Sequence, residues 1–197
     1  MNYNEEMKRI INSLDGKKKI LLHSCCAPCS SSVIERLKDY FDITVLYYNP
    51  NIEPLEEFEK RKKEQIRLLK ELNISFLDID YLNEEFHRKI VGFENEPENG
   101  ARCPICYELR IEKCALLAKD HGYDYFGTTL TISPHKPSKI INEIGLKLEK
   151  KYDIKFLVSD FKKEDGYKRS IELSKEYGLY RQDYCGCFYS RRVNNEE

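Results

Sequence analysis

Seven of the eight cysteines in this chain of 197 residues fall into three short groups, so sulfur chemistry is the first possibility to consider. The groups are Cys25, Cys26 and Cys29, then Cys103 and Cys106, and finally Cys185 and Cys187. Thiols crowded in this way are typical of a metal site or a redox couple. Each group lies in a turn beside a predicted helix or strand, so the fold decides whether the three groups meet.

The eighth cysteine, Cys114, lies within the apolar run Cys114-Ala115-Leu116-Leu117-Ala118 of a predicted helix. A buried thiol in such a run usually packs as a small hydrophobic side chain. We therefore expect Cys114 to belong to the core and to take no part in the site.

The charge balance and the segments at the start of the chain limit the function classes. The 33 Lys and Arg residues nearly cancel the 34 Asp and Glu residues, which excludes a uniformly basic nucleic-acid surface but not a local basic face. No signal peptide and no apolar run long enough to span a bilayer are found, so we expect a cytoplasmic protein without membrane contact. In a reducing compartment, cysteines serve as metal ligands or catalytic thiols more often than as structural disulfides.

Alternating apolar runs and amphipathic patterns predict an α/β fold, with an open, mainly parallel five-stranded sheet and helices on both faces. The predicted strands cover residues 19–22, 43–48, 74–79, 123–130 and 155–158. The predicted helices cover 1–14, 55–72, 83–91, 136–150 and 167–177, and two more begin at 30 and at 102. We expect one domain over 1–197, with an N-terminal helix in 1–16 and a helical and loop extension in 160–197 that completes the metal site.

The first cysteine group follows the first predicted strand directly, within His23-Ser24-Cys25-Cys26-Ala27-Pro28-Cys29. Ligands of open parallel sheets bind outside the carboxyl ends of the strands. The stretch is therefore predicted to be a strand-to-helix turn at the edge of the sheet where ligands bind.

The spacing of the thiols favours some metal sites over others. A structural zinc site needs four ligands in two matched pairs, and the adjacent Cys25 and Cys26 fit that pattern poorly. An iron–sulfur cluster tolerates irregular spacing because its ligands need only reach different irons. Cys185-Gly186-Cys187 can close only a small, strained disulfide that is easily reduced, so this pair could relay two electrons or hold a second metal.

Five blocks of this sequence, in order, resemble the signature of the QueH family of cobalamin-independent epoxyqueuosine reductases. The blocks are residues 23–29, 48–52, 102–107, 126–136 and 184–187, and the resemblance extends from about Lys18 to Ser190. It implies an iron–sulfur oxidoreductase that carries out the last step of queuosine biosynthesis. The substrate would be tRNA carrying epoxyqueuosine in its anticodon loop, and the electron donor is not identified.

The resemblance also implies roles for individual residues. A 4Fe-4S cluster would be held by Cys25, Cys26, Cys103 and Cys106, and Cys185 and Cys187 would form a redox-active pair. A mononuclear iron beside the cluster would find its ligands among Cys29, Asp183, Cys185 and Cys187. Loss of the epoxide oxygen needs a proton donor, and the titratable residues near the thiol motifs are His23, Tyr107, His135 and Asp183. We favour His135, because it lies in a loop after a strand.

The pattern of strands also resembles the ATP-pyrophosphatase (HUP-like, Rossmann-type) fold of tRNA thiolases, whose phosphate loop reads Ser-Gly-Gly-x-Asp-Ser. The corresponding turn here, residues 24–30, lacks both glycines, so backbone amides cannot wrap a pyrophosphate and ATP is not expected. Two alternatives stay open at this point. They are an ATP-dependent tRNA sulfur-transfer enzyme with a cluster and a non-catalytic zinc RNA-binding module.

A local basic face for RNA is expected from several Lys and Arg clusters, of which the first is Lys60-Arg61-Lys62-Lys63. The others are Lys136, Lys139, Lys162-Lys163, Lys168-Arg169 and Arg191-Arg192. Unpaired bases of an anticodon loop are recognised by stacking on aromatic side chains. Suitable aromatic residues are Tyr107, Tyr167, Tyr180, Tyr184, Phe188 and Tyr189.

Overall fold

The computed structural model, which describes residues 2–190, contains a five-stranded sheet in which every strand pair is parallel. The strands are β1 (Lys18–His23), β2 (Phe41–Leu46), β3 (Ser75–Leu77), β4 (Tyr125–Thr128) and β5 (Lys155–Phe156). Their order across the sheet is β3-β2-β1-β4-β5. The chain first adds β2 and β3 on one side of β1 and then adds β4 and β5 on the other side. The topological switch point, where the direction of strand addition reverses, therefore lies between β1 and β4.

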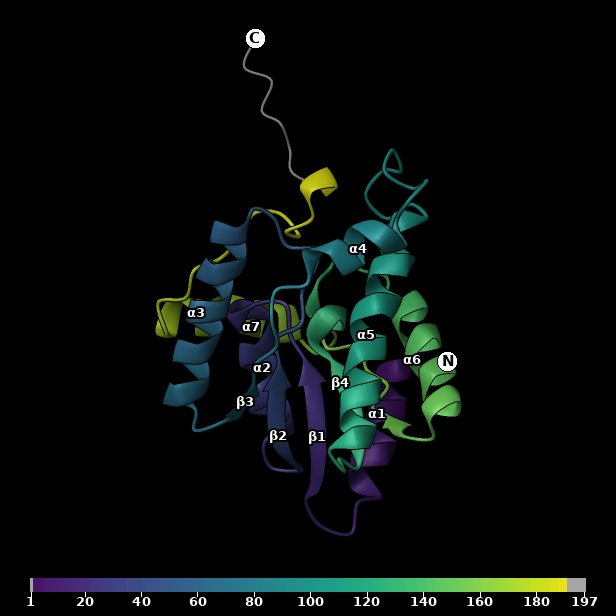
Figure 1. Ribbon diagram of the computed structural model, residues 1–197. Helices are drawn as coiled ribbons and strands as arrows, with labels where there is room; N and C mark the ends of the chain where they lie inside the picture. The colour runs from purple at the N-terminus through teal and green to yellow at the C-terminus, as the bar shows by residue number, and fades with distance from the viewer. Residues whose placement is uncertain (1, 191–197) are drawn as a thin grey trace.

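Helices cover both faces of the sheet, as predicted (Figure 1). One face carries α1 (Tyr3–Asn12), α2 (Ala27–Leu37), α3 (Leu55–Glu71) and α7 (Gly166–Glu176). The other face carries α4 (Asn83–Lys89), α5 (Arg102–Asp120) and α6 (Ser138–Tyr152). Short 3-10 turns, η1 (Thr129–Ile132) and η2 (Phe188–Ser190), complete the elements. No helix within residues 2–190 is long and apolar enough to cross a bilayer.

The central strand is apolar throughout because both of its faces are buried. Ile20 and Leu22 join the core cluster that includes residues of α1 and α2, whereas Leu21 joins the cluster on the α5 side. Successive side chains of a strand point to opposite faces, so His23 shares the face of Leu21. The histidine at the end of β1 therefore lies on the side of the sheet that α5 covers.

The first helix after β1 begins earlier than predicted, at Ala27 instead of residue 30. Cys26 is its N-cap, and the Cys26 Sγ accepts a hydrogen bond from the Cys29 amide at 3.3 Å. Pro28 lies in the first turn, where a missing N–H breaks no helical hydrogen bond. Only residues 24–26 are therefore a turn, and Cys29 belongs to α2.

Several predicted strands are too long at their carboxyl ends. Tyr47 and Tyr48 lie beyond β2, and the predicted strand at residues 129–130 is instead the start of η1. The Thr128 hydroxyl accepts a hydrogen bond from the Leu130 amide at 3.2 Å, which caps this turn.

The single-domain organisation stays a prediction. Residues 191–197 of the expected extension, with Arg191 and Arg192, lie outside the described residues.

Candidate metal centre and redox site

The three cysteine groups converge at the end of the sheet where the parallel strands finish. One group follows β1, one opens α5, and one lies in the tail after α7. Four of the seven thiols are buried in one core cluster, and the other three pack against it. The buried four are Cys25, Cys26, Cys106 and Cys187, and the other three are Cys29, Cys103 and Cys185. Segments about 80 residues apart in sequence thus present their sulfurs to one region.

A cavity of about 320 Å³ opens beside these thiols. Its lining includes Cys25, Cys29 and Cys185, together with His135 and Asp183. Two of the four residues considered as proton donors therefore line the same cavity as cysteines of the first and third groups. Among the described residues that line the cavity, Cys26, Cys103, Cys106 and Cys187 do not appear.

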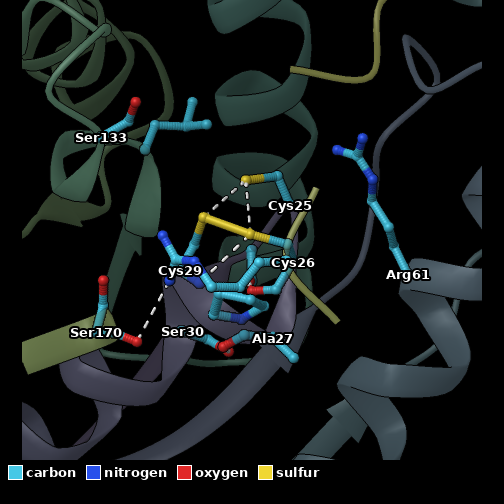
Figure 2. The surroundings of a disulfide bond; sticks show 12 residues. Cys25, Cys26, Ala27, Cys29, Ser30, Arg61, Ser133 and Ser170 are labelled. Carbon is cyan, nitrogen blue, oxygen red and sulfur yellow. Dashed lines mark hydrogen bonds between the residues drawn. A yellow bond between two sulfur atoms is a disulfide. The ribbon is translucent and has the colours of Figure 1, made fainter. Parts of the chain in front are cut away.

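The first group is the tightest, because its three Sγ atoms all lie within 4.8 Å of one another. The Cys25 Sγ lies 3.8 Å from that of Cys26 and 3.6 Å from that of Cys29 (Figure 2). Two ligands of one metal ion, at bond lengths of about 2.3 Å, are at most about 4.6 Å apart. These two separations are short enough for shared ligation of one ion.

A disulfide joins Cys26 to Cys29, which differs from the expectation that the motif cysteines are free ligands. The reason is local, because the cap residue and a residue three positions later in a helix are neighbours, here with Cα atoms 5.4 Å apart. The other candidate pair, Cys185 and Cys187, is free. A sulfur in a disulfide is not a thiolate ligand, so disulfide formation and metal ligation by Cys26 exclude each other.

The second group lies in the first two turns of α5, where the positive end of the helix dipole favours thiolates. The Cys103 Sγ accepts a hydrogen bond from the Asn99 amide at 3.3 Å. Burial raises the pKa of Cys106 to about 11, against the opposing charge of Arg110. A thiolate at Cys106 therefore needs a further positive charge, which a metal site supplies.

His23 is fully buried and joins the carboxyl ends of β1, β2 and β4. Its Nδ1 lies 2.9 Å from the hydroxyl of Thr128, and its Nε2 lies 3.1 Å from the carbonyl of Tyr48 and 3.2 Å from the Asn49 Oδ1. Nε2 faces acceptors, so it carries the proton. Burial and then the charge of Arg110 lower the pKa of His23 to about 3. His23 is thus neutral and fully hydrogen-bonded in this structure, which argues against the proton-donor role considered for it.

Of the other residues considered from the sequence, Tyr107 and Cys114 are also buried. Burial raises the pKa of the Tyr107 hydroxyl, and the charge of Cys103 adds to this effect. The Cys114 thiol donates a hydrogen bond to the carbonyl of Leu21 at 3.3 Å, so its expected place in the core is confirmed.

Arg61 connects the third cysteine group to α3 by hydrogen bonds, although the sequence suggested that this arginine is part of a basic surface. Its side chain is 1% exposed, and its Nε donates to Glu57 at 2.6 Å. The Nη1 donates to the carbonyl of Cys185 at 3.1 Å, and the Nη2 to that of Tyr184 at 3.3 Å. Arg61 therefore points inward, and the expected role in a basic face is wrong for this residue. Figure 2 shows its guanidinium beside the first cysteine group.

Gly186 is needed where it stands, between the two tail cysteines. Its φ is +105°, a region that residues with a Cβ rarely adopt. A Cβ there would lie 2.8 Å from Ile52 Cγ1 and 3.0 Å from Arg61 Nη1. Its carbonyl accepts a hydrogen bond from the Glu53 amide at 2.8 Å. The tail, the segment after α7 that carries Cys185 and Cys187, thus contacts the loop after β2 as well as α3.

The two tail thiols have opposite protonation preferences. A hydrogen bond from Cys187 lowers the pKa of Cys185, and the charge of Lys136 and the Ser190 hydroxyl, 3.0 Å away, act in the same direction. The pKa of Cys187 is raised by this interaction with Cys185 and by burial. The pair therefore presents one thiolate at Cys185 and one thiol at Cys187.

Lys136 is a residue whose role the sequence analysis missed, since it was assigned only to a basic face. The structure places it in the lining of the cavity, where its charge acts on Cys185. The available signal was its position directly after His135, in a loop between η1 and α6.

Comparison with known proteins agrees with the thiol arrangement. Residues 20–193 match the family described as epoxyqueuosine reductase QueH. The chain is 42% identical to epoxyqueuosine reductase QueH of Streptococcus pyogenes, over 96% of this chain and 76% of the relative. It is 44% identical to the protein of that name in Haemophilus influenzae (92% and 75%) and 35% identical to that in Thermotoga maritima (90% and 93%).

A solved structure with the same fold is the U34-tRNA thiolase NcsA from Methanococcus maripaludis with its [4Fe-4S] cluster. The TM-score is 0.55 at 15% identity, over 95% of this chain and 67% of that one. This likeness confirms the expected fold class, in which a parallel sheet carries a site at its carboxyl edge. With a family match over most of the sequence and relatives at 35–44% identity, the chain belongs to the QueH family of epoxyqueuosine reductases.

Proposed function

We propose that this chain reduces the epoxide of epoxyqueuosine in tRNA and so forms the cyclopentene ring of queuosine. The observation that carries the proposal is the convergence of seven cysteines from three segments in one core cluster, three of which line a cavity, in a chain of the QueH family. Deoxygenation of an epoxide consumes two electrons and two protons and releases one water. A site rich in thiols and metal ligands is suited to supply them.

The proposed ligands of a 4Fe-4S cluster are Cys25, Cys26, Cys103 and Cys106, and the bound cluster would supply electrons one at a time. The arrangement of these residues fits such a group. Cys25 and Cys106 are buried, two helix N-termini face the site, and the thiols of α5 lie outside the 4.8 Å group, as ligands of separate irons do. The Cys25 and Cys26 sulfurs, 3.8 Å apart, would have to move apart to reach separate irons. A mononuclear iron beside the cluster, with ligands among Cys29, Asp183, Cys185 and Cys187, is the alternative to a redox role of the tail pair.

The Cys26–Cys29 disulfide must be reduced before Cys26 can bind metal. Iron loading of the protein is therefore expected to require a thiol reductant. The same treatment keeps Cys185 and Cys187 as free thiols, so the whole site is assembled under one condition.

The tail pair is proposed to balance the reaction. When the Cys185 thiolate and the Cys187 thiol close a disulfide, they release two electrons and one proton, and His135 supplies the second proton that one epoxide needs. An external reductant then returns the pair to the dithiol. Because one member is a thiolate and the other a thiol, Cys185 is the nucleophilic sulfur and Cys187 holds the proton.

His135 is proposed to protonate the departing oxygen, because it lines the same cavity as Cys185 and its side chain is exposed to solvent. Asp183 lines this cavity as well, and we propose that it binds the second iron or orients the substrate. Lys136 is proposed to keep Cys185 ionised.

The mouth of the cavity is the proposed docking place for the anticodon loop. Lys136 and Arg181 supply positive charge there, and Tyr167 and Tyr184 supply aromatic faces on which bases can stack. A tRNA substrate and the absence of a membrane-spanning helix in residues 2–190 support a cytoplasmic location.

The test is incubation of the iron-loaded protein with tRNA carrying epoxyqueuosine and a strong reductant, followed by mass analysis of the nucleosides. We expect the modified nucleoside to lose one oxygen, and metal analysis to find about four or more irons per chain. Release of AMP with sulfur transfer would instead support an ATP-dependent thiolase. One zinc per chain, no colour and no turnover would support a non-catalytic zinc module.

A further inference from the structure

A buried arginine stands on the same face of α5 as the second cysteine group. Arg110 follows Cys106 by four positions and Cys103 by seven, so the three side chains lie on one side of the helix. The Arg110 side chain is only 3% exposed. Its Nε donates to the carbonyl of Cys106 at 3.2 Å, which fixes the guanidinium beside the thiols.

No carboxylate of residues 2–190 forms an ion pair with Arg110. The contrast with Arg61 is direct, since that buried guanidinium has Glu57 as its partner. Removing a charge from water is costly unless an opposite charge compensates for it. The fold therefore maintains a buried positive charge whose partner must come from the cysteine site.

The groups that interact with this charge are the thiols themselves. Burial acts to lower the pKa of Arg110, and the charges of Cys106, Cys25 and Cys185, one from each cysteine group, more than offset this effect. Arg110 is thus a buried charged group that acts on all three cysteine groups, whereas Lys136, in the cavity lining, acts on Cys106 and Cys185.

We propose that Arg110 is the built-in counter-charge of the iron–sulfur group and raises its reduction potential, an inference that rests on the proposed function. Thiolate ligands make such a group anionic, and each added electron adds one more negative charge. A fixed positive charge nearby favours the reduced form, since net charge and hydrogen bonding tune these potentials. Arg110 does not touch the substrate, so it is a positioning residue that acts through the bound group.

The experiment compares three variants of the iron-loaded chain. Arg110→Met removes the charge and keeps the length of the side chain, whereas Arg110→Lys keeps the charge and loses the planar fork. Lys119→Met is the matched control, because it removes one charge from the same helix at an exposed position paired with Asp153. The readouts are the midpoint potential of the chromophore and the thermal unfolding of the iron-free form.

We expect Arg110→Met to make the midpoint more negative. Held at the wild-type midpoint, the variant should show about a tenfold lower ratio of reduced to oxidised form, which is 59 mV for one electron. Arg110→Lys should restore most of the shift, and Lys119→Met should show none. The iron-free Arg110→Met form should unfold at a temperature no lower than wild type, since an uncompensated buried charge has been removed.

An Arg110→Met protein that binds iron with an unchanged midpoint overturns the proposal, and so does a shift that Arg110→Lys fails to reduce. If Arg110→Met folds but binds no iron, the Arg110→Lys variant decides between charge and shape. Iron binding by Arg110→Lys supports the proposed role of the charge. Failure of Arg110→Lys to bind iron shows that the shape of the arginine side chain matters instead, which contradicts the proposal. If Arg110→Met does not fold, Arg110→Gln gives the same comparison. Failure of the proposed function looks different, because the wild-type chain itself would then lack the chromophore or the turnover.

Discussion

The guanidinium of Arg61 donates a hydrogen bond to the backbone carbonyl of Cys185 at 3.1 Å, across 124 positions of sequence. This contact and the neighbouring one to Tyr184 fix the tail on α3. The position of the redox pair therefore depends on a side chain that carries none of the chemistry. Because Arg61 forms hydrogen bonds with Glu57 and with the tail, but with none of the proposed cluster ligands, its loss should separate turnover from metal binding.

We expect Arg61→Met to lower turnover at least tenfold while the iron-loaded protein keeps its colour. Loss of the guanidinium leaves two carbonyls without this donor and removes the charge partner of Glu57, which keeps the hydrogen bond from the Tyr180 hydroxyl, so the free energy of unfolding should fall by about 3 kcal/mol. Nucleoside analysis, visible absorption and urea unfolding check this. Lys63→Met is the control, because Lys63 is an exposed residue of the same helix. Full turnover by Arg61→Met would show that the tail needs no such anchor.

Gly186→Ala should abolish turnover and leave the iron content unchanged, since a Cβ would collide with Ile52 and Arg61. Gly178→Ala is a matched control. Gly178 also has a positive φ, of +57°, but nothing lies within 4 Å of the added carbon. Both variants should lose about 1 kcal/mol of stability from backbone strain, and only Gly186→Ala should lose activity. Equal activities in the two variants would show that the close contact of Gly186 with Ile52 and Arg61 is not needed for turnover.

Neutral, buried His23 should make the fold sensitive to acid. The unfolded histidine binds a proton near pH 6.5, whereas the folded one does so only near 3. Between these values the unfolded state holds more protons, so stability is complete above about pH 6.5 and falls as the pH drops. The slope from this residue is about 1.4 kcal/mol per pH unit.

His23→Gln should therefore flatten the dependence of the unfolding free energy on pH between 6.5 and 4, although it lowers stability at pH 7. Urea unfolding of the iron-free protein at several pH values measures this slope. His121→Gln, at an exposed position, should keep the wild-type slope. A wild-type slope in His23→Gln would assign the acid sensitivity to other groups.

Cys185 should react as a thiolate in the reduced, iron-free protein at a pH where an ordinary cysteine is protonated. Lys136→Met removes a positive charge that favours this thiolate, so the pH profile of Cys185 alkylation should move to higher pH. Mass mapping of the alkylated peptide measures the rate. Lys139→Met, which removes an exposed charge paired with Glu143, should leave the profile in place. An identical profile in Lys136→Met would remove this lysine from the site.

The sequence predicted the fold class, the strand-helix alternation and the thiol motifs because these depend on local patterns. Core burial of Cys114 and a helix opening at Arg102 are examples. The role of Arg61 could not be predicted, since its partners lie more than 120 positions away and the local pattern is a charged helix. The place of Arg110 was within reach, because its spacing of four and seven positions from Cys106 and Cys103 places it on their face of the helix.

Two other differences arise where local geometry overrides a pattern. Pro28 suggested a turn, but its position in a first helical turn brings Cys26 and Cys29 together instead. The apolar run at Tyr47 and Tyr48 suggested more strand, yet these residues continue into the loop whose Glu53 amide holds Gly186. In both cases the difference from the prediction brings residues of the cysteine site into contact.

We propose that the three cysteine groups form one site with divided tasks, in which α5 and the turn after β1 hold the cluster and the tail performs the redox step. The most direct test measures colour and epoxyqueuosine turnover together in Cys103→Ser and Cys185→Ser. We predict that Cys103→Ser loses the chromophore and with it the activity, whereas Cys185→Ser stays coloured and inactive. A fully active Cys185→Ser protein would contradict the account.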